Sequence, residues 1–268
     1  MIPTHSIDQL AETWASIIEL GTGLTEAQWK SPTDLPGWTV QDNLAHLIGT
    51  ERMLQGLPRT EHLCEPGPHV RNDLGRMTEV EVDARRGCTG AEVFKEFSDL
   101  VELRLATLRA GDDDYFATPS MTPGGQADVA TFHMFRSLDN WLHEQDMRRA
   151  LGVPGHLGGP AAEHTVDRLI LTIPIVVGKR AGTPEGGAVE ITITGDVARH
   201  VIAEVDGGRA KVVPVPSAAP LAAITMDTET FVVLACGRRT AAELADRITS
   251  TGDLALATKV VENFNMMI

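Results

Sequence analysis

The spacing of apolar residues changes once along the chain, and this change limits the fold more than any other feature. Over roughly the first 155 residues, apolar side chains recur at helical spacing, as at Ile7, Leu10, Trp14 and Ile17. After about residue 185, short alternating β-branched runs separated by Gly and Asp replace this pattern. The sequence therefore predicts a helical region followed by a region that contains a sheet.

Five segments of the first region fit helices. Ser6 is placed to cap the first helix, and Thr39 to cap the second, which carries His46. The expected helices cover about 7–20, 40–57, the region around 79–87, 91–108 and about 129–151. The segment 112–128 is rich in Gly, Pro and Asp, and we expect a loop there. These segments predict an all-helical bundle of four or five helices.

The second region begins after a sixth expected helix, from Ala161 to about Lys179, which Pro174 should kink or interrupt because proline lacks a backbone N–H. The runs AVEITITGD, HVIAEVDGG and AKVVPVP then predict an antiparallel meander. From Asp227 onwards the pattern is helix, strand (DRITSTG) and helix. We therefore divide the chain into a helical bundle over 1–155, a connecting segment over 156–184 and an α+β domain over 185–268.

Composition excludes several classes of function. The formal net charge is −14 and no compact Lys/Arg cluster offsets it, which argues against a nucleic-acid partner. Cys64, Cys88 and Cys236 are odd in number and form no CxxC pair, so we expect a reducing compartment and no disulfide framework. No signal peptide or membrane-spanning run is present, which predicts a cytoplasmic protein with no membrane partner. The sequence leaves open whether it is a monomer or a homodimer.

One stretch, SLDNWLHEQDMRRALG, carries residues suited to chemistry. Asp139 and His143 are four residues apart on a predicted helix and so project from the same face. His46 lies among apolar residues of the second helix, and we expect it to face the bundle interior. Two imidazoles and one carboxylate with an open fourth position are the ligand set of catalytic zinc.

Simpler interpretations of these residues exist. An Asp and a His four apart on a helix commonly make a surface hydrogen bond, and an inward His46 is commonly a hydrogen-bonded core residue. Glu144 and Asp146 of the same stretch are expected to be solvated or paired with arginines. The spacing of residues alone leaves the metal site and these alternatives open.

Four stretches resemble a known family. GWTVQDNLAHLIGTERML, RNDLGRMTEVEVDARRGCTGAEVFKEF, LHEQDMRRALG and AAITMDTETFVVLACGRR are similar to the mycothiol-dependent maleylpyruvate isomerase family, part of the wider DinB-like group of actinobacterial thiol-dependent metalloenzymes. The resemblance covers nearly the whole chain. It implies an N-terminal DinB-like four-helix bundle that binds zinc, followed by a smaller C-terminal α+β domain similar to sterol carrier proteins.

The resemblance also assigns roles to individual residues. The family's metal ligands correspond to His46, Asp139 and His143, although the family usually has Glu where this chain has Asp139. The shorter Asp side chain must approach the ion more closely.

Arginines that hold substrate carboxylates in the family have four candidates in this chain. Arg76 or Arg85 would act from the bundle, and Arg238 or Arg239, in the CGRR turn, from the C-terminal domain. Because CGRR follows the apolar run FVVLAC, we expect its arginines to reach a cleft between the domains.

The function implied is thiol chemistry. Mycothiol would occupy the open zinc position as a thiolate and attack a small electrophile, leading to isomerisation or S-transfer. Two alternatives belong to other classes. One is a non-catalytic module that binds a lipid or another small molecule and keeps a vestigial metal site, and the other is a metal-assisted hydrolase in which water takes the thiol's place.

Overall fold

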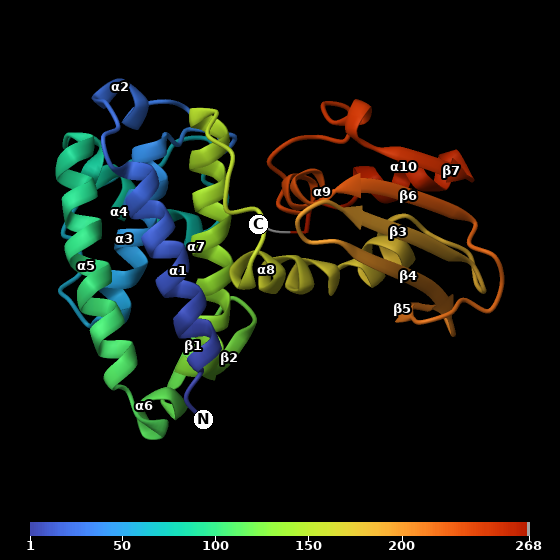
Figure 1. Cartoon of the computed structure of the whole chain (residues 1–268), viewed down its shortest axis with the longest axis horizontal. Helices are drawn as coiled ribbons and strands as arrows, with labels where there is room; N and C mark the ends of the chain where they lie inside the picture. Colours follow the sequence, from blue (N-terminus) through green and yellow to red (C-terminus); the bar gives the residue numbers. More distant parts are fainter. Residues whose placement is uncertain (267–268) are drawn as a thin grey trace. The chain divides into compact units, whose positions relative to one another are not determined.

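The computed structural model describes residues 1–266, which form two compact units, one over Met1–His156 and one that begins at Leu157 (Figure 1). The first unit is a helical bundle. The second unit contains a mixed sheet with helices packed against it. The predicted order of a helical domain followed by a sheet-containing domain is therefore confirmed.

Long helices build the first unit, and α3 packs against α4, α5 and α7, while α1 packs against α5 and α7. The helices are α1 (Thr4–Gly21), α2 (Glu26–Trp29), α3 (Val40–Leu54), α4 (Asp73–Arg86), α5 (Gly90–Ala110), α6 (Asp113–Ala117) and α7 (Val129–Leu151). The predicted cap of α3 is confirmed, because the Thr39 side chain accepts a hydrogen bond from the backbone N–H of Asp42. The predicted cap at Ser6 is wrong, since α1 begins at Thr4 and no side chain caps it.

Apolar stripes explain why these helices pack together. Leu10, Trp14 and Ile17 face the core from α1, and Leu44, Leu47 and Ile48 face it from α3. Phe97 and Leu108 of α5 are fully buried in the same cluster. Spacings of three and four residues place each set on one face of its helix, so burial of the stripes holds the bundle together.

The expectation of an all-helical first unit is wrong in one segment. Residues 112–128, expected to be a loop, form α6 and a hairpin of β1 (Pro119–Thr122) and β2 (Gly125–Asp128). A two-residue turn joins the strands, and the Thr122 hydroxyl accepts from the N–H of Gly124 and donates to the carbonyl of Gly125. Pro and Gly mark hairpin turns as well as loops, and four-residue strands are too short to show a period of two.

The sheet of the second unit has the strand order β5-β4-β3-β6-β7. Its strands are β3 (Ala188–Thr194), β4 (Arg199–Asp206), β5 (Arg209–Val213), β6 (Ala222–Asp227) and β7 (Thr249–Gly252). The pair β3 and β6 is parallel, so the expectation of a purely antiparallel sheet is wrong. Alternation indicates a strand but carries no information on its direction. The strand over 222–227 is an element that the sequence analysis does not predict.

Helices complete the second unit: α8 (Pro160–Ile170), α9 (Thr228–Ala235) and α10 (Leu254–Glu262). As expected, the sixth helical segment is interrupted near Pro174, because α8 ends at Ile170 and a π-helical turn follows over Ile175–Arg180. Over the part of the chain that the structure describes, no helix combines the length and the apolar character needed to cross a bilayer.

His156 fixes the C-terminal end of the first unit. Its backbone has a φ of 53°, in the left-handed region, and its carbonyl accepts hydrogen bonds from the Trp141 indole at 2.9 Å and the Gln145 amide at 3.3 Å. Its ring lies 2.7 Å from a carboxylate oxygen of the buried Glu144, which also accepts from Arg148. The hydrogen bond to Glu144 raises the pKa of His156 above its ordinary value.

The raised pKa predicts a pH-dependent contribution to stability. Protonated His156 stabilises the fold, so its contribution is complete below the ordinary histidine pKa of about 6.5 and is lost as pH rises through the raised folded value. We expect His156→Gln to lower the free energy of unfolding more at about pH 5.5 than at about pH 9, by urea denaturation. An equal loss at both pH values would contradict this interpretation.

Gly90 gives a second test of the packing. A Cβ at this first residue of α5 would lie 2.0 Å from Cγ of Trp29, a core side chain that is 3% exposed. We expect Gly90→Ala to destabilise the bundle by about 1–3 kcal/mol, measured by chemical denaturation. Gly87→Ala is the matched control, because a Cβ there meets nothing within 4 Å. Equal midpoints for both variants would show that the Trp29 contact has no energetic weight.

Candidate metal centre

His46 of α3 meets Asp139 and His143 of α7 inside the bundle. The three residues offer ligand atoms that all lie within 4.8 Å of one another. His46 Nε2 is 3.2 Å from Asp139 Oδ2, and His143 Nε2 is 3.6 Å from Asp139 Oδ1. The structure thus brings together the three residues that the sequence analysis selected, two from one helix and one from 93 residues away.

The spacing and chemistry of these donors fit a divalent ion. Ligands held at about 2.0–2.2 Å from a tetrahedral zinc ion lie about 3.3–3.6 Å apart. The observed separations of 3.2 and 3.6 Å need little adjustment to reach that arrangement. Two nitrogens and one oxygen leave at least one position for another molecule.

His143 is held in the orientation that a ligand needs. Its Nδ1 lies 2.7 Å from Oδ1 of the buried Asn43, which accepts the Nδ1 proton and directs Nε2 towards Asp139. The Asn43 amide is itself fixed, because its Nδ2 donates to the carbonyl of Thr39 at 2.9 Å. The first turn of α3 therefore sets the tautomer of His143 on α7.

The electrostatics favour metal-binding forms for two of the three residues. Burial lowers the pKa of His46, which favours the neutral imidazole. Although burial opposes ionisation of Asp139, the Arg136 guanidinium and the imidazoles hold the pKa of that carboxyl well below its usual range. Burial also disfavours protonation of His143, but its contacts with Asp139 and Asp146 outweigh this and raise its pKa. The Asp139 side chain remains 32% exposed, so the cluster is not sealed.

Trp38 supports both imidazoles from one side. Its ring centre lies 5.3 Å from that of His46 and 5.9 Å from that of His143. The indole N–H donates to Oε2 of Glu79 at 3.0 Å, and the Glu79 side chain is 1% exposed. A buried carboxylate of α4 therefore fixes the ring that packs against the candidate ligands.

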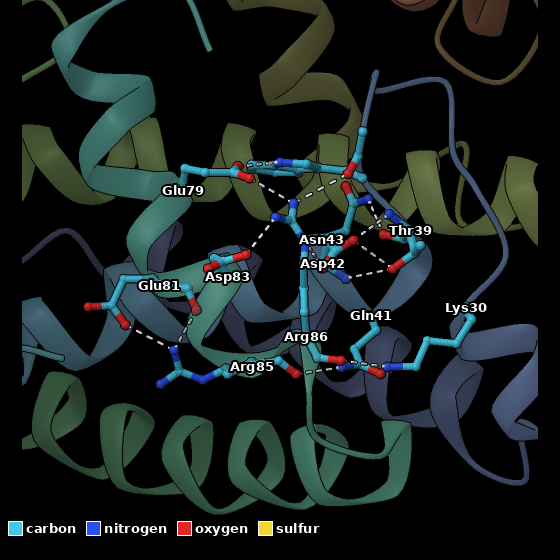
Figure 2. Close-up of polar contacts among 12 residues, drawn as sticks. Lys30, Thr39, Gln41, Asp42, Asn43, Glu79, Glu81, Asp83, Arg85 and Arg86 are labelled. Atoms are coloured by element: carbon cyan, nitrogen blue, oxygen red, sulfur yellow. Dashed lines mark hydrogen bonds and ion pairs between the residues drawn. The ribbon is translucent and has the colours of Figure 1, made fainter. Parts of the chain in front are cut away.

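Arg86 links Glu79, which holds the Trp38 indole, to Asp42 in the first turn of α3 (Figure 2). Its guanidinium lies 2.7 Å from Glu79, 3.0 Å from Asp83 and 3.5 Å from Asp42. Asp42 in turn accepts from the backbone N–H of Thr39 at 2.8 Å and completes the cap of α3. One cation therefore links the carboxylates that position Trp38 and the helix carrying His46.

The bundle arginines proposed for substrate binding are not joined to the cluster by any contact that the described residues show. Arg76 is 63% exposed and faces Asp73 at 3.8 Å. Arg85 is buried and makes a bidentate pair with Glu96, at 2.7 and 2.8 Å. It also donates a hydrogen bond to Glu81, which Figure 2 shows. Its donors are thus occupied by carboxylates of the bundle itself. A role for Arg76 or Arg85 in substrate binding stays a prediction.

Arg238 and Arg239 lie in the turn that begins after the last residue of α9, Ala235. One Nη of Arg238 donates to the carbonyl of Cys236 at 3.0 Å, which tightens the CGRR turn. That Arg238 or Arg239 reaches towards the cluster stays a prediction.

Sequence reasoning missed several residues around the cluster. Asn43 and Arg136 each lie three residues before a predicted ligand, a helical spacing that signals contact with the same face. Glu51, which pairs with Arg136, and Arg104, which pairs with Glu51, gave no comparable signal, because their contacts join different helices.

Comparison with known proteins places most of the chain in one family. Residues 10–148 match the model of the mycothiol maleylpyruvate isomerase N-terminal domain, and residues 163–259 match that of the corresponding C-terminal domain. Comparison with curated proteins found no significant match.

Among solved structures, two share the fold of this chain. A crystal structure of the mycothiol-dependent maleylpyruvate isomerase shares the fold, with a TM-score of 0.55 and 14% identity over 94% of this chain and 93% of that one; a point mutant of that enzyme gives the same values. Sterol carrier protein 2 like 2 from Aedes aegypti matches 36% of this chain and 94% of its own at 20% identity, with a TM-score of 0.29 that is too low to establish a common fold. Since the family models together span most of the sequence, the chain belongs to the mycothiol-dependent maleylpyruvate isomerase family of enzymes.

Proposed function

We propose that this protein is a metal-dependent isomerase or S-transferase that uses mycothiol as co-substrate and acts on a small electrophile. His46, Asp139 and His143 would hold the ion, and the donor set favours zinc. The observation that carries the proposal is the convergence of two imidazoles and one carboxylate on a partly open cluster. Membership of the family supports mycothiol as the thiol.

The ion would supply one kind of chemistry, a lowered thiol pKa that makes the thiolate available near neutral pH. The chain's own residues provide the setting. Asn43 keeps Nε2 of His143 free to donate its lone pair, and Arg136 keeps Asp139 ionised. Trp38 packs against both imidazoles from one side.

The protein's own cysteines are not needed for this reaction. Cys236 is buried, and Cys64 and Cys88 are partly buried free thiols. Burial raises the pKa of Cys64, and nearby acidic groups raise it further, which disfavours the thiolate. A small-molecule thiol is the better nucleophile, and its use fits a reducing compartment such as the cytoplasm. An arginine such as Arg238 or Arg239 would bind a carboxylate of the substrate.

The two imidazoles are each needed to hold the ion in this proposal. We expect His46→Ala and His143→Ala to lose the bound metal and the thiol-transfer activity together, because each removes one of three donors. Metal content is measured by elemental analysis, and activity by mass spectrometry of conjugates formed from mycothiol and a panel of electrophiles. His200→Ala is the control, since His200 lies exposed on β4 and pairs with Glu190. Full metal content in either ligand variant would show that the site is elsewhere.

The same assay separates thiol transfer from hydrolysis. Removing mycothiol from the metal-loaded enzyme should abolish turnover if the thiol is the nucleophile. Turnover that persists without any thiol would instead identify a metal-activated water as the attacking group.

A further prediction concerns the carboxylate ligand. We expect Asp139→Glu, which introduces the more common residue of the family, to keep the metal and the activity, whereas Asp139→Ala should lose both. Elemental analysis and the conjugate assay check the pair. Metal loss in Asp139→Glu as complete as in Asp139→Ala would mean that the site is built for the shorter side chain.

A further inference from the structure

A row of four alternating charges crosses the bundle core and ends at Asp139. Arg104 Nε of α5 lies 2.9 Å from Glu51 Oε2 of α3, and the other oxygen, Oε1, lies 2.8 Å from Arg136 Nε of α7. Arg136 Nη1 then donates to Asp139 Oδ2. Arg104 and Glu51 are 0% exposed and Arg136 is 4% exposed. The row sums to zero charge, which meets the requirement that buried charges be compensated.

Arg104, at the end of the row away from Asp139, also makes hydrogen bonds outside the row. Arg104 Nη1 donates to Gln55 Oε1 at 3.0 Å, and Nη2 lies 3.1 Å from His133 Nε2. His133 Nδ1 is 2.7 Å from the carbonyl of Val129, so the ring donates there and accepts from Arg104. Every nitrogen of the Arg104 guanidinium therefore has a partner, which fixes its orientation.

Glu51 links Arg104 to Arg136 by pairing with both guanidinium groups. Burial opposes ionisation of Glu51, but the two arginines outweigh it and lower its pKa, so it is charged in the fold. The carboxylate uses one oxygen for each arginine, and rotation of either guanidinium would leave a buried charge unpaired. The position of Arg136 is thus set by α3 and α5, as well as by its own helix.

We propose that Arg136 is a positioning residue that orients the Asp139 carboxylate towards His46 and His143, with Glu51 and Arg104 holding Arg136 in place. The inference rests on the proposed metal centre and adds residues that never contact the ion. A ligand carboxylate that is already oriented loses less conformational freedom on binding, and loss of such outer partners typically lowers metal affinity about 10- to 100-fold.

Charge and orientation make opposite predictions for Arg136, which allows them to be separated. Removing a cation beside the ion should strengthen metal binding if charge dominates, and weaken it if orientation dominates. Arg136→Lys keeps the charge and loses the planar fork that binds Asp139 and Glu51 together. If charge dominates, the metal affinity of Arg136→Lys should equal that of the wild type. If orientation dominates, its metal affinity should be lower.

The experiment measures Zn²⁺ affinity of the full chain by competition with a chelator. We expect Arg136→Met to bind about 10- to 100-fold more weakly and Arg136→Lys to lie between it and the wild type. With Co²⁺ in place of zinc, the visible absorption of both variants should differ from that of the wild type, because the geometry around the ion changes. Wild-type or tighter affinity in both variants would overturn the proposal. If Arg136→Met does not fold, the lysine variant decides alone.

Arg148→Met is the matched control for a purely structural loss. Arg148 is a second buried arginine of α7, and it pairs with Glu144 at 2.7 Å without contacting the three ligands. We expect Arg148→Met to have a lower free energy of unfolding than the wild type, but the same zinc affinity and the same Co²⁺ spectrum. A loss of affinity equal to that of Arg136→Met would reduce the role of Arg136 to general stability.

His46→Ala in the same assay tests the metal centre itself. If it binds zinc as tightly as the wild type, the proposed function is wrong. If it loses zinc while both Arg136 variants bind normally, only the positioning role fails.

Discussion

The need to compensate buried charge shapes the centre of the bundle. Arg104, Glu51, Arg136 and Asp139 alternate in sign across three helices, and removing one partner of such a buried pair typically costs about 3–5 kcal/mol. Because of that penalty, α3, α5 and α7 must pack in the one arrangement that keeps all of these pairs formed. The candidate ligands lie at the end of this row, so the same constraint that orders the core also orders the metal centre.

The centre also depends on interactions near the start of α3. The cap at Thr39 fixes where the helix begins, and this sets the faces on which Asn43 and His46 lie. Arg86 of α4 compensates Asp42 beside that cap and Glu79, which holds the Trp38 indole. The imidazoles of His46 and His143 therefore pack against the Trp38 ring, and the ion pair between Glu79 and Arg86 helps to hold that ring in place. Local capping and tertiary ion pairs act on the same few residues.

The two units contribute unequally to the proposed chemistry. The three candidate metal ligands, and the residues that orient them, all belong to the first unit. The second unit carries the CGRR turn, whose arginines are suited to a substrate carboxylate.

The sequence alone determined what depends on neighbours within one element. Helical spacing predicted the bundle, the limits of α7 and the shared face of Asp139 and His143, and Thr39 marked the start of α3. Tertiary structure decided what depends on packing between elements: the meeting of His46 with Asp139, the bond from His143 to Asn43 across 100 residues and the parallel pairing of β3 with β6. Periodicity fixes which side of a helix or strand a residue occupies, but the partner of that side is chosen by the packing and charge compensation of the whole domain.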